Sequence, residues 1–99
     1  MIKHIENIEQ FNEEIKGKLV LVDFFADWCG PCKMLAPELV KLDEEVDIRI
    51  VKVNVDELPA LARQFRVMTI PTLMLYRNGE FVKRESAYMP VDVLKEFVK

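Results

Sequence analysis

The sequence has only three glycines, five prolines and two cysteines among 99 residues. This scarcity excludes collagen-like, low-complexity and disulfide-rich chains, which depend on those residues. Long runs of like charge are also missing, and 14 Lys and Arg against 17 Asp and Glu leave a net charge of −3. A chain without a basic run does not favour binding to a nucleic-acid backbone, so we expect no nucleic-acid partner.

Long apolar segments are absent as well. None approaches the roughly 20 residues that a membrane-spanning helix needs, and Lys and Glu interrupt the first twenty residues, where a signal peptide would be apolar. We therefore expect a cytoplasmic protein without a membrane partner. The hydrophobic fraction of 51% is enough for one packed core, so we expect a single domain over residues 1–99 that folds alone. We also expect a monomer, although the sequence leaves the oligomeric state open.

The hydrophobic pattern predicts alternating strands and helices. Strands are expected near 2–5 and at 19–25, 48–55, 72–76 and 81–83, the last two joined by a hairpin turn at Asn78-Gly79. Helices are expected at 7–16, from Pro31 to about 46 with Pro37 inside, at 59–65, and from Pro90 onward. This order predicts an α/β fold with a central mixed sheet of four to five strands and helices on both faces.

The two cysteines lie in Cys29-Gly30-Pro31-Cys32, where a buried strand turns into a helix. The free N–H groups and the dipole of a helix N-terminus favour an anion, so we expect a lowered pKa for Cys29 and assign it as the nucleophile. Cys32 follows one turn later, is expected to be more shielded from solvent, and is assigned as the resolving thiol. Pro31 suits a first helical turn because that position needs no N–H donor.

Two further interpretations of the cysteine pair are weaker. A structural disulfide that closes so short a loop restricts the unfolded chain little. A zinc site needs about four ligands, and the chain adds only His4 to the two cysteines. We therefore expect redox chemistry, with no bound metal or cofactor.

Asp23 interrupts the apolar strand that precedes the cysteines. A buried carboxylate is costly, so its pKa is expected to rise, and it would then suit the exchange of a proton with Cys32. The alternative is a strand residue whose side chain reaches solvent or a backbone donor. Lys52 lies in a strand that helices should cover, and pairing with Asp23 would explain both residues; the alternative is a lysine that extends to solvent without a role.

Trp28 is a candidate contact residue, and the Ile70–Pro71 bond is a candidate cis peptide. Trp28 precedes the nucleophile at the lip of a strand-to-helix turn, where an exposed indole would contact a partner protein. Thr69-Ile70-Pro71-Thr72 places a proline just before a strand, where proline is tolerated, and the sequence leaves the cis or trans state of that peptide open.

The segment from Val22 to Lys33 closely resembles the active-site segment of thioredoxins, and Pro37, Ile70-Pro71-Thr72 and Asn78-Gly79 fall where that family has its helix-kink proline, cis-proline loop and hairpin turn. The resemblance covers essentially the whole chain and implies a thioredoxin fold. It implies a cytosolic protein-disulfide reductase that acts on oxidised proteins and is recharged by thioredoxin reductase with electrons from NADPH. For site residues it implies a cis Pro71, a buried pair of Asp23 and Lys52, and a substrate groove lined by Trp28, Gly30, Pro31, Thr69, Ile70, Pro71 and Ala87.

The sequence departs from the family pattern at a few positions near the groove. Phe25 replaces a second tryptophan, Thr69 replaces a small residue, and Ala87 with Tyr88 replaces a glycine that helps to line the groove. These departures leave open a thioredoxin-like protein specialised for one partner. A thiol oxidase or isomerase on the same fold, and a binding subunit of another enzyme, also remain open as functions; Gly30-Pro31 and the expected compartment favour reduction.

Overall fold

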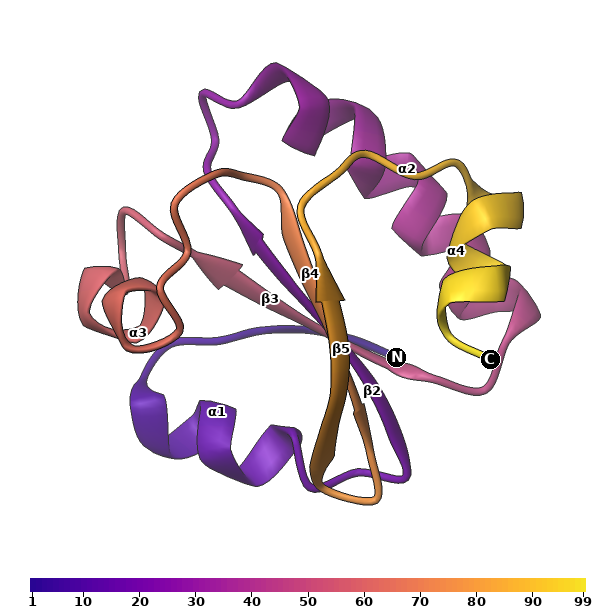
Figure 1. Cartoon of the computed structure of the whole chain (residues 1–99), viewed down its shortest axis with the longest axis horizontal. Helices are drawn as coiled ribbons and strands as arrows, with labels where there is room; N and C mark the ends of the chain where they lie inside the picture. The colour runs from indigo at the N-terminus through magenta and orange to yellow at the C-terminus, as the bar shows by residue number, and fades with distance from the viewer.

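The computed structural model describes all 99 residues and has five strands and four helices (Figure 1). The strands are β1 (Ile2–His4), β2 (Leu19–Phe25), β3 (Arg49–Asn54), β4 (Thr72–Arg77) and β5 (Glu80–Glu85). The helices are α1 (Ile8–Glu14), α2 (Gly30–Glu45), α3 (Pro59–Gln64) and α4 (Val91–Phe97). The predicted order of elements is confirmed, and their ends differ from the prediction by at most two residues.

The strands form one mixed sheet in the order β1-β3-β2-β4-β5. β1, β3 and β2 run parallel, whereas β4 is antiparallel to β2 and β5 is antiparallel to β4. Asn78 and Gly79 link β4 to β5 with φ values of 54° and 83°, the left-handed conformations that a tight hairpin turn requires. β2 therefore lies at the centre of the sheet.

Helices cover both faces of this sheet, with α1 and α3 on one side and α2 and α4 on the other (Figure 1). Leu21, Leu35, Leu39 and Leu94 are among the buried residues of the core under α2 and α4. The opposite core contains Phe11, Val20, Phe24 and Leu61, among others. A strand covered on both faces needs apolar side chains in both directions, which explains the almost continuous apolar run in β2.

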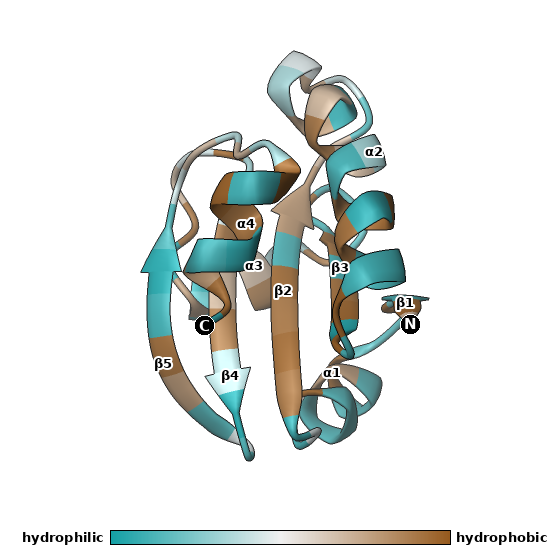
Figure 2. Ribbon diagram, turned by 90° about the vertical axis from the view of Figure 1, so that its right-hand side faces the viewer, coloured by the Kyte–Doolittle hydropathy of each residue, from teal (hydrophilic) through white to brown (hydrophobic).

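Figure 2 shows β2 as hydrophobic along most of its length, interrupted by one hydrophilic band. Asp23 is the only charged residue of β2, and it pairs in register with Lys52 of β3. The two strands are parallel, so their carboxyl ends meet at the same edge of the sheet, where the chain turns from β2 into α2. The fold thus brings the cysteines, Asp23 and Lys52 into one region.

Candidate active site

The cysteines occupy the beginning of α2. Cys29 is the N-cap residue, with an extended backbone at φ −84° and ψ 114°, and its Sγ accepts a hydrogen bond from the backbone N–H of Cys32 at 3.2 Å. Pro31 lies in the first turn, where no helix hydrogen bond needs its missing N–H. Cys29 and Cys32 are joined by a disulfide, with Cα atoms 5.2 Å apart. The arrangement places one sulfur directly at the positive end of a 16-residue helix.

The two cysteines are buried to nearly the same extent, with 5% of Cys29 and 4% of Cys32 exposed. In the disulfide form Cys32 is thus only marginally the more shielded of the two, a smaller difference than we expected. The reason is the loop before β4, which covers Cys29: the carbonyl oxygen of Ile70 lies 3.8 Å from Cys29 Sγ, and Ile70 packs against the cluster of Ala26 and the two cysteines.

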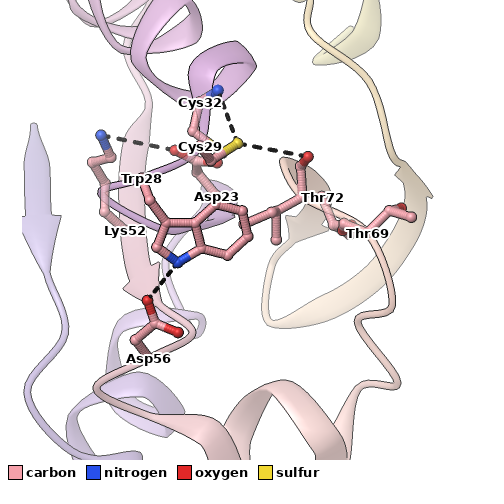
Figure 3. The surroundings of a disulfide bond; sticks show 9 residues. Asp23, Trp28, Cys29, Cys32, Lys52, Asp56, Thr69 and Thr72 are labelled. Atoms are coloured by element: carbon pink, nitrogen blue, oxygen red, sulfur yellow. Dashed lines mark hydrogen bonds and ion pairs between the residues drawn. A yellow bond between two sulfur atoms is a disulfide. The ribbon is translucent and has the colours of Figure 1, made fainter.

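Asp23 lies beneath the cysteines with only 1% of its surface exposed. Its Oδ2 is 3.8 Å from Nζ of Lys52, and its Oδ1 has no hydrogen-bond partner (Figure 3). Burial raises the pKa of Asp23 to about 6, because the charged form loses its hydration, and the Lys52 ammonium offsets part of that rise. A carboxyl with this pKa exists in both protonation states near neutral pH.

The ammonium of Lys52 is held by more than the carboxylate. Nζ lies 4.6 Å from the centroid of the Phe25 ring, a cation–π contact, and the side chain of Lys52 is only 12% exposed. On the other side, His4 of β1 pairs in register with Lys52 and meets the Phe25 ring edge-on at 6.4 Å between centroids. Phe25 thus fixes the lysine that faces Asp23.

An open pocket of about 270 Å³ lies between β2 and α2. Its lining residues are Phe25, Ala26, Asp27, Cys32, Lys33, Ala36 and Lys52. Cys32 and Lys52 both line this pocket, whereas Ile70 does not. A larger depression of about 510 Å³ lies at the opposite end of β2, lined by Lys18, Arg49 and Arg77 among others, and includes no residue of the cysteine site.

Trp28 is exposed at 69% of its surface, as expected for a contact residue. Its indole Nε1 donates a hydrogen bond to Oδ2 of Asp56 at 2.9 Å, which fixes the ring next to the cysteines (Figure 3). Asp56 is itself placed by Asn54, whose side-chain oxygen accepts hydrogen bonds from the N–H groups of Asp56 and Glu57 at 2.9 and 3.3 Å.

The remaining residues predicted for the groove lie at the start of α2, in the loop before β4 and after β5. The Ile70–Pro71 peptide is cis, as the resemblance implies, with Pro71 buried and Thr69 exposed. Gly30 and Pro31 are exposed at the start of α2, and Ala87 is half-buried in the connection that follows β5. The structure brings Cys29, Cys32, Asp23, Lys52 and Ile70 together, whereas Ala87 belongs to neither the cysteine cluster nor the pocket beside it.

Sequence reasoning missed two polar residues near the site, Asp56 and Ser86, and it placed Thr72 in the cis-proline loop without its hydrogen-bond partners. Asp56 is 28 positions from Trp28, and no local pattern links the two residues. Thr72 is completely buried and bonds to Ser86, 14 positions away on the next segment. One feature of the sequence could have indicated the Thr72–Ser86 bond: the only serine and threonine residues in the chain are Thr69, Thr72 and Ser86.

No three His, Cys, Asp or Glu side chains converge in a way that would hold a metal ion. None of the four helices is long and apolar enough to cross a membrane.

Comparison with known proteins gives one family. The thioredoxin family model matches residues 2–99. Thioredoxin of Chlamydia caviae is 52% identical over 85 residues, which cover 85% of this chain and 82% of the relative. Thioredoxin of Bacillus subtilis is 44% identical over 92 residues, which cover 91% of this chain and 88% of the relative.

Solved structures give the same result for the fold. A mutant thioredoxin from Halobacterium salinarum superposes with a TM-score of 0.91 at 36% identity, covering 98% of this chain and 87% of that structure. Oxidised mitochondrial thioredoxin 3 of Saccharomyces cerevisiae superposes with a TM-score of 0.90 at 35% identity, covering 98% and 92%.

Proposed function

The chain belongs to the thioredoxin family and is a protein-disulfide reductase. We propose that Cys29 attacks the substrate disulfide and that Cys32 resolves the mixed disulfide. In the same proposal Asp23 accepts the proton of Cys32, and Lys52 adjusts the pKa of Asp23. The observation that carries this assignment is the position of Cys29 Sγ at the N-terminus of α2, where it accepts the Cys32 N–H and is disulfide-bonded to Cys32. In the dithiol form the same N–H and the helix dipole would stabilise the Cys29 thiolate.

The reaction begins with the reduced protein. The Cys29 thiolate attacks one sulfur of a substrate disulfide, a new S–S bond joins Cys29 to the substrate, and the other substrate sulfur leaves as a thiolate that takes a proton from solvent. The Cys32 thiol then gives its proton to the Asp23 carboxylate and attacks Cys29 Sγ. The mixed disulfide breaks, the second substrate sulfur leaves, and the Cys29–Cys32 disulfide forms. The substrate gains two electrons and the protein loses two.

Asp23 suits this role because burial and Lys52 shift its pKa in opposite directions. Burial raises its pKa to about 6, so the carboxylate is a better proton acceptor than an exposed aspartate, while Lys52 keeps a large fraction of it ionised near neutral pH. The open pocket beside Cys32 and Lys52 supports exchange of that proton with solvent after each cycle.

The groove around Cys29 provides the contact surface for the substrate. An exposed indole held by Asp56 and a loop whose Ile70 carbonyl faces Cys29 Sγ support this assignment. A protein that brings its disulfide to Cys29 must contact Trp28, Gly30 and Pro31 on one side. It meets Thr69, Ile70 and Pro71 on the other side, with Ala87 beyond them.

Electrons must be returned to the disulfide after each turnover. We assign this step to a thioredoxin reductase that draws on NADPH, with no cofactor bound to the chain itself. A cytoplasmic location belongs to the same proposal, because a compartment that keeps thiols reduced suits a reductant. We propose that the protein works as a monomer, since the substrate and the reductase would use the same exposed face in turn.

A dedicated partner is the second candidate. Tyr88 is exposed at 38% of its surface beside the half-buried Ala87. Side chains therefore occupy this edge of the groove, which a glycine would leave open. Such a protein would keep the cysteine chemistry and act on fewer targets.

The proposal is tested by mixing the protein with NADPH, a bacterial thioredoxin reductase and insulin as the disulfide substrate. We expect NADPH consumption only when all components are present, and none when Cys29→Ser replaces the wild type. Consumption that is unchanged by Cys29→Ser would contradict the assignment. A protein that accepts electrons from the reductase and fails to reduce insulin would favour the dedicated partner.

A further inference from the structure

All three serine and threonine residues of the chain lie in one hydrogen-bonded cluster. Thr72, the first residue of β4, is completely buried. Its Oγ1 lies 2.6 Å from the carbonyl oxygen of Thr69 and 2.8 Å from Oγ of Ser86. Apart from the two tyrosines, all hydroxyl side chains of the protein thus lie beside the cis-proline loop.

The direction of these hydrogen bonds follows from the number of protons. A carbonyl oxygen can only accept, so the single hydroxyl proton of Thr72 is donated to Thr69. Thr72 Oγ1 therefore accepts from Ser86, whose hydroxyl is the donor. The result is a directed chain from the Ser86 hydroxyl through the Thr72 hydroxyl to the Thr69 carbonyl, in which each bond strengthens the next.

This chain connects two segments that are distant in sequence. Thr69 precedes Ile70, whose carbonyl faces Cys29 Sγ, and cis Pro71 follows. Ser86 immediately follows β5 and precedes Ala87. Figure 3 shows Thr69 and Thr72 on the side of the cysteines opposite Lys52. The hydroxyl chain thus lies behind the wall of the groove, away from the Asp23 carboxyl.

We propose that Ser86 is a positioning residue for protein substrates: through Thr72 it holds the Thr69–Pro71 loop in the conformation that receives the polypeptide around the target disulfide. This role rests on the proposed disulfide reductase function and concerns how that function selects substrates. Ser86 bonds to neither cysteine nor Asp23, so it affects substrate binding and leaves the thiol chemistry unchanged.

Removal of the Ser86 hydroxyl leaves a buried Thr72 oxygen without its donor. The Thr72 hydroxyl then loses the bond that aligns it, and its own bond to the Thr69 carbonyl becomes weaker. A substrate would have to order the loop on binding, which weakens binding without changing the attack at sulfur. The loss of one such restraint corresponds to about a fivefold to tenfold weaker interaction.

The test compares Ser86→Ala with Ser86→Thr, which retains a hydroxyl donor. Initial rates are measured with insulin, using dithiothreitol as the electron source, and separately with the small disulfide 5,5′-dithiobis(2-nitrobenzoic acid), which needs no loop contact. For Ser86→Ala we expect KM for insulin to rise about fivefold to tenfold with kcat unchanged. The rate with the small disulfide and the reduction potential should stay at wild-type values, and Ser86→Thr should restore KM.

Three results would overturn the role of Ser86. They are an unchanged KM in Ser86→Ala, an equal loss of rate with both substrates, and a Ser86→Thr variant as weak as Ser86→Ala. In each of these cases the wild type still reduces insulin, so the proposed function stands. A wild-type protein that does not reduce insulin would instead overturn the proposed function itself.

Discussion

Asp23 and Lys52 face each other across the parallel pair of β2 and β3, with Oδ2 and Nζ 3.8 Å apart. The distance is longer than a hydrogen bond, and the second oxygen of Asp23 has no partner. Lys52 therefore compensates the charge of the carboxylate only in part, and the pKa of Asp23 remains raised, at about 6. This incomplete compensation links the stability of the fold to its chemistry.

The first prediction concerns stability. Because the pKa of Asp23 is higher in the folded protein than the ordinary value of 3.8, the folded state is favoured most below about pH 4 and loses that advantage as pH rises through about 6. Asp23→Asn removes a group whose ionisation is costly, so its free energy of unfolding should exceed that of the wild type by up to about 3 kcal/mol above pH 7. Urea unfolding of the two proteins, each with its disulfide intact, measures the difference across this pH range. A variant less stable than the wild type at high pH would show that Asp23 has a structural role.

The second prediction concerns the rate of resolution. Asp23→Asn removes the carboxylate that we propose as the proton acceptor of Cys32, whereas Cys29 keeps its position at the helix N-terminus. The attack of Cys32 should slow by about a hundredfold, the lower end of the range for general-base catalysis, while the first attack changes less. Single-turnover kinetics with a fluorescent disulfide substrate separate the two steps. Equal rates for both steps in variant and wild type would remove Asp23 from the proton-transfer role.

The third prediction concerns Lys52. Lys52→Met keeps the long apolar part of the side chain and removes the ammonium that lowers the Asp23 pKa, so this pKa should rise above about 6. The carboxyl carbon of Asp23 can be titrated by NMR in both proteins. Lys41→Met is a suitable control, since Lys41 is exposed and pairs with Glu38 on α2. A pKa of Asp23 that is unchanged by Lys52→Met, or shifted equally by the control, would contradict the pairing.

The fourth prediction concerns the cysteines. Cys32→Ser leaves Cys29, the proposed nucleophile, at the helix N-terminus and removes the thiol that we propose releases the product, so it should accumulate a mixed disulfide with insulin. Intact-mass spectrometry without reductant detects the added mass. Cys29→Ser should form no such adduct through Cys32, because Cys32 lacks the N-cap position that stabilises a thiolate. Normal turnover by Cys32→Ser would show that the roles of the two cysteines are wrong.

The fold was predictable because its signals are local. The apolar run of β2, the Asn78-Gly79 turn and the Cys29–Cys32 spacing each act over a few residues, and strands alternating with helices leave few arrangements of the sheet. The near-equal burial of the cysteines was not predictable, since it depends on the Ile70 loop folding back from 41 positions away. The same applies to the bond between Trp28 and Asp56, which requires Asn54 to shape the loop after β3.

The central claim is that the Cys29–Cys32 pair donates electrons to protein disulfides. The most direct test is its midpoint reduction potential, measured by equilibration with glutathione buffers and thiol labelling at pH 7. We predict a value more negative than about −220 mV. Such a value is more reducing than that of disulfide isomerases, at about −180 mV, or of disulfide oxidases, at about −120 mV. A value less negative than about −220 mV would contradict a reductase and assign the pair to oxidation or isomerisation.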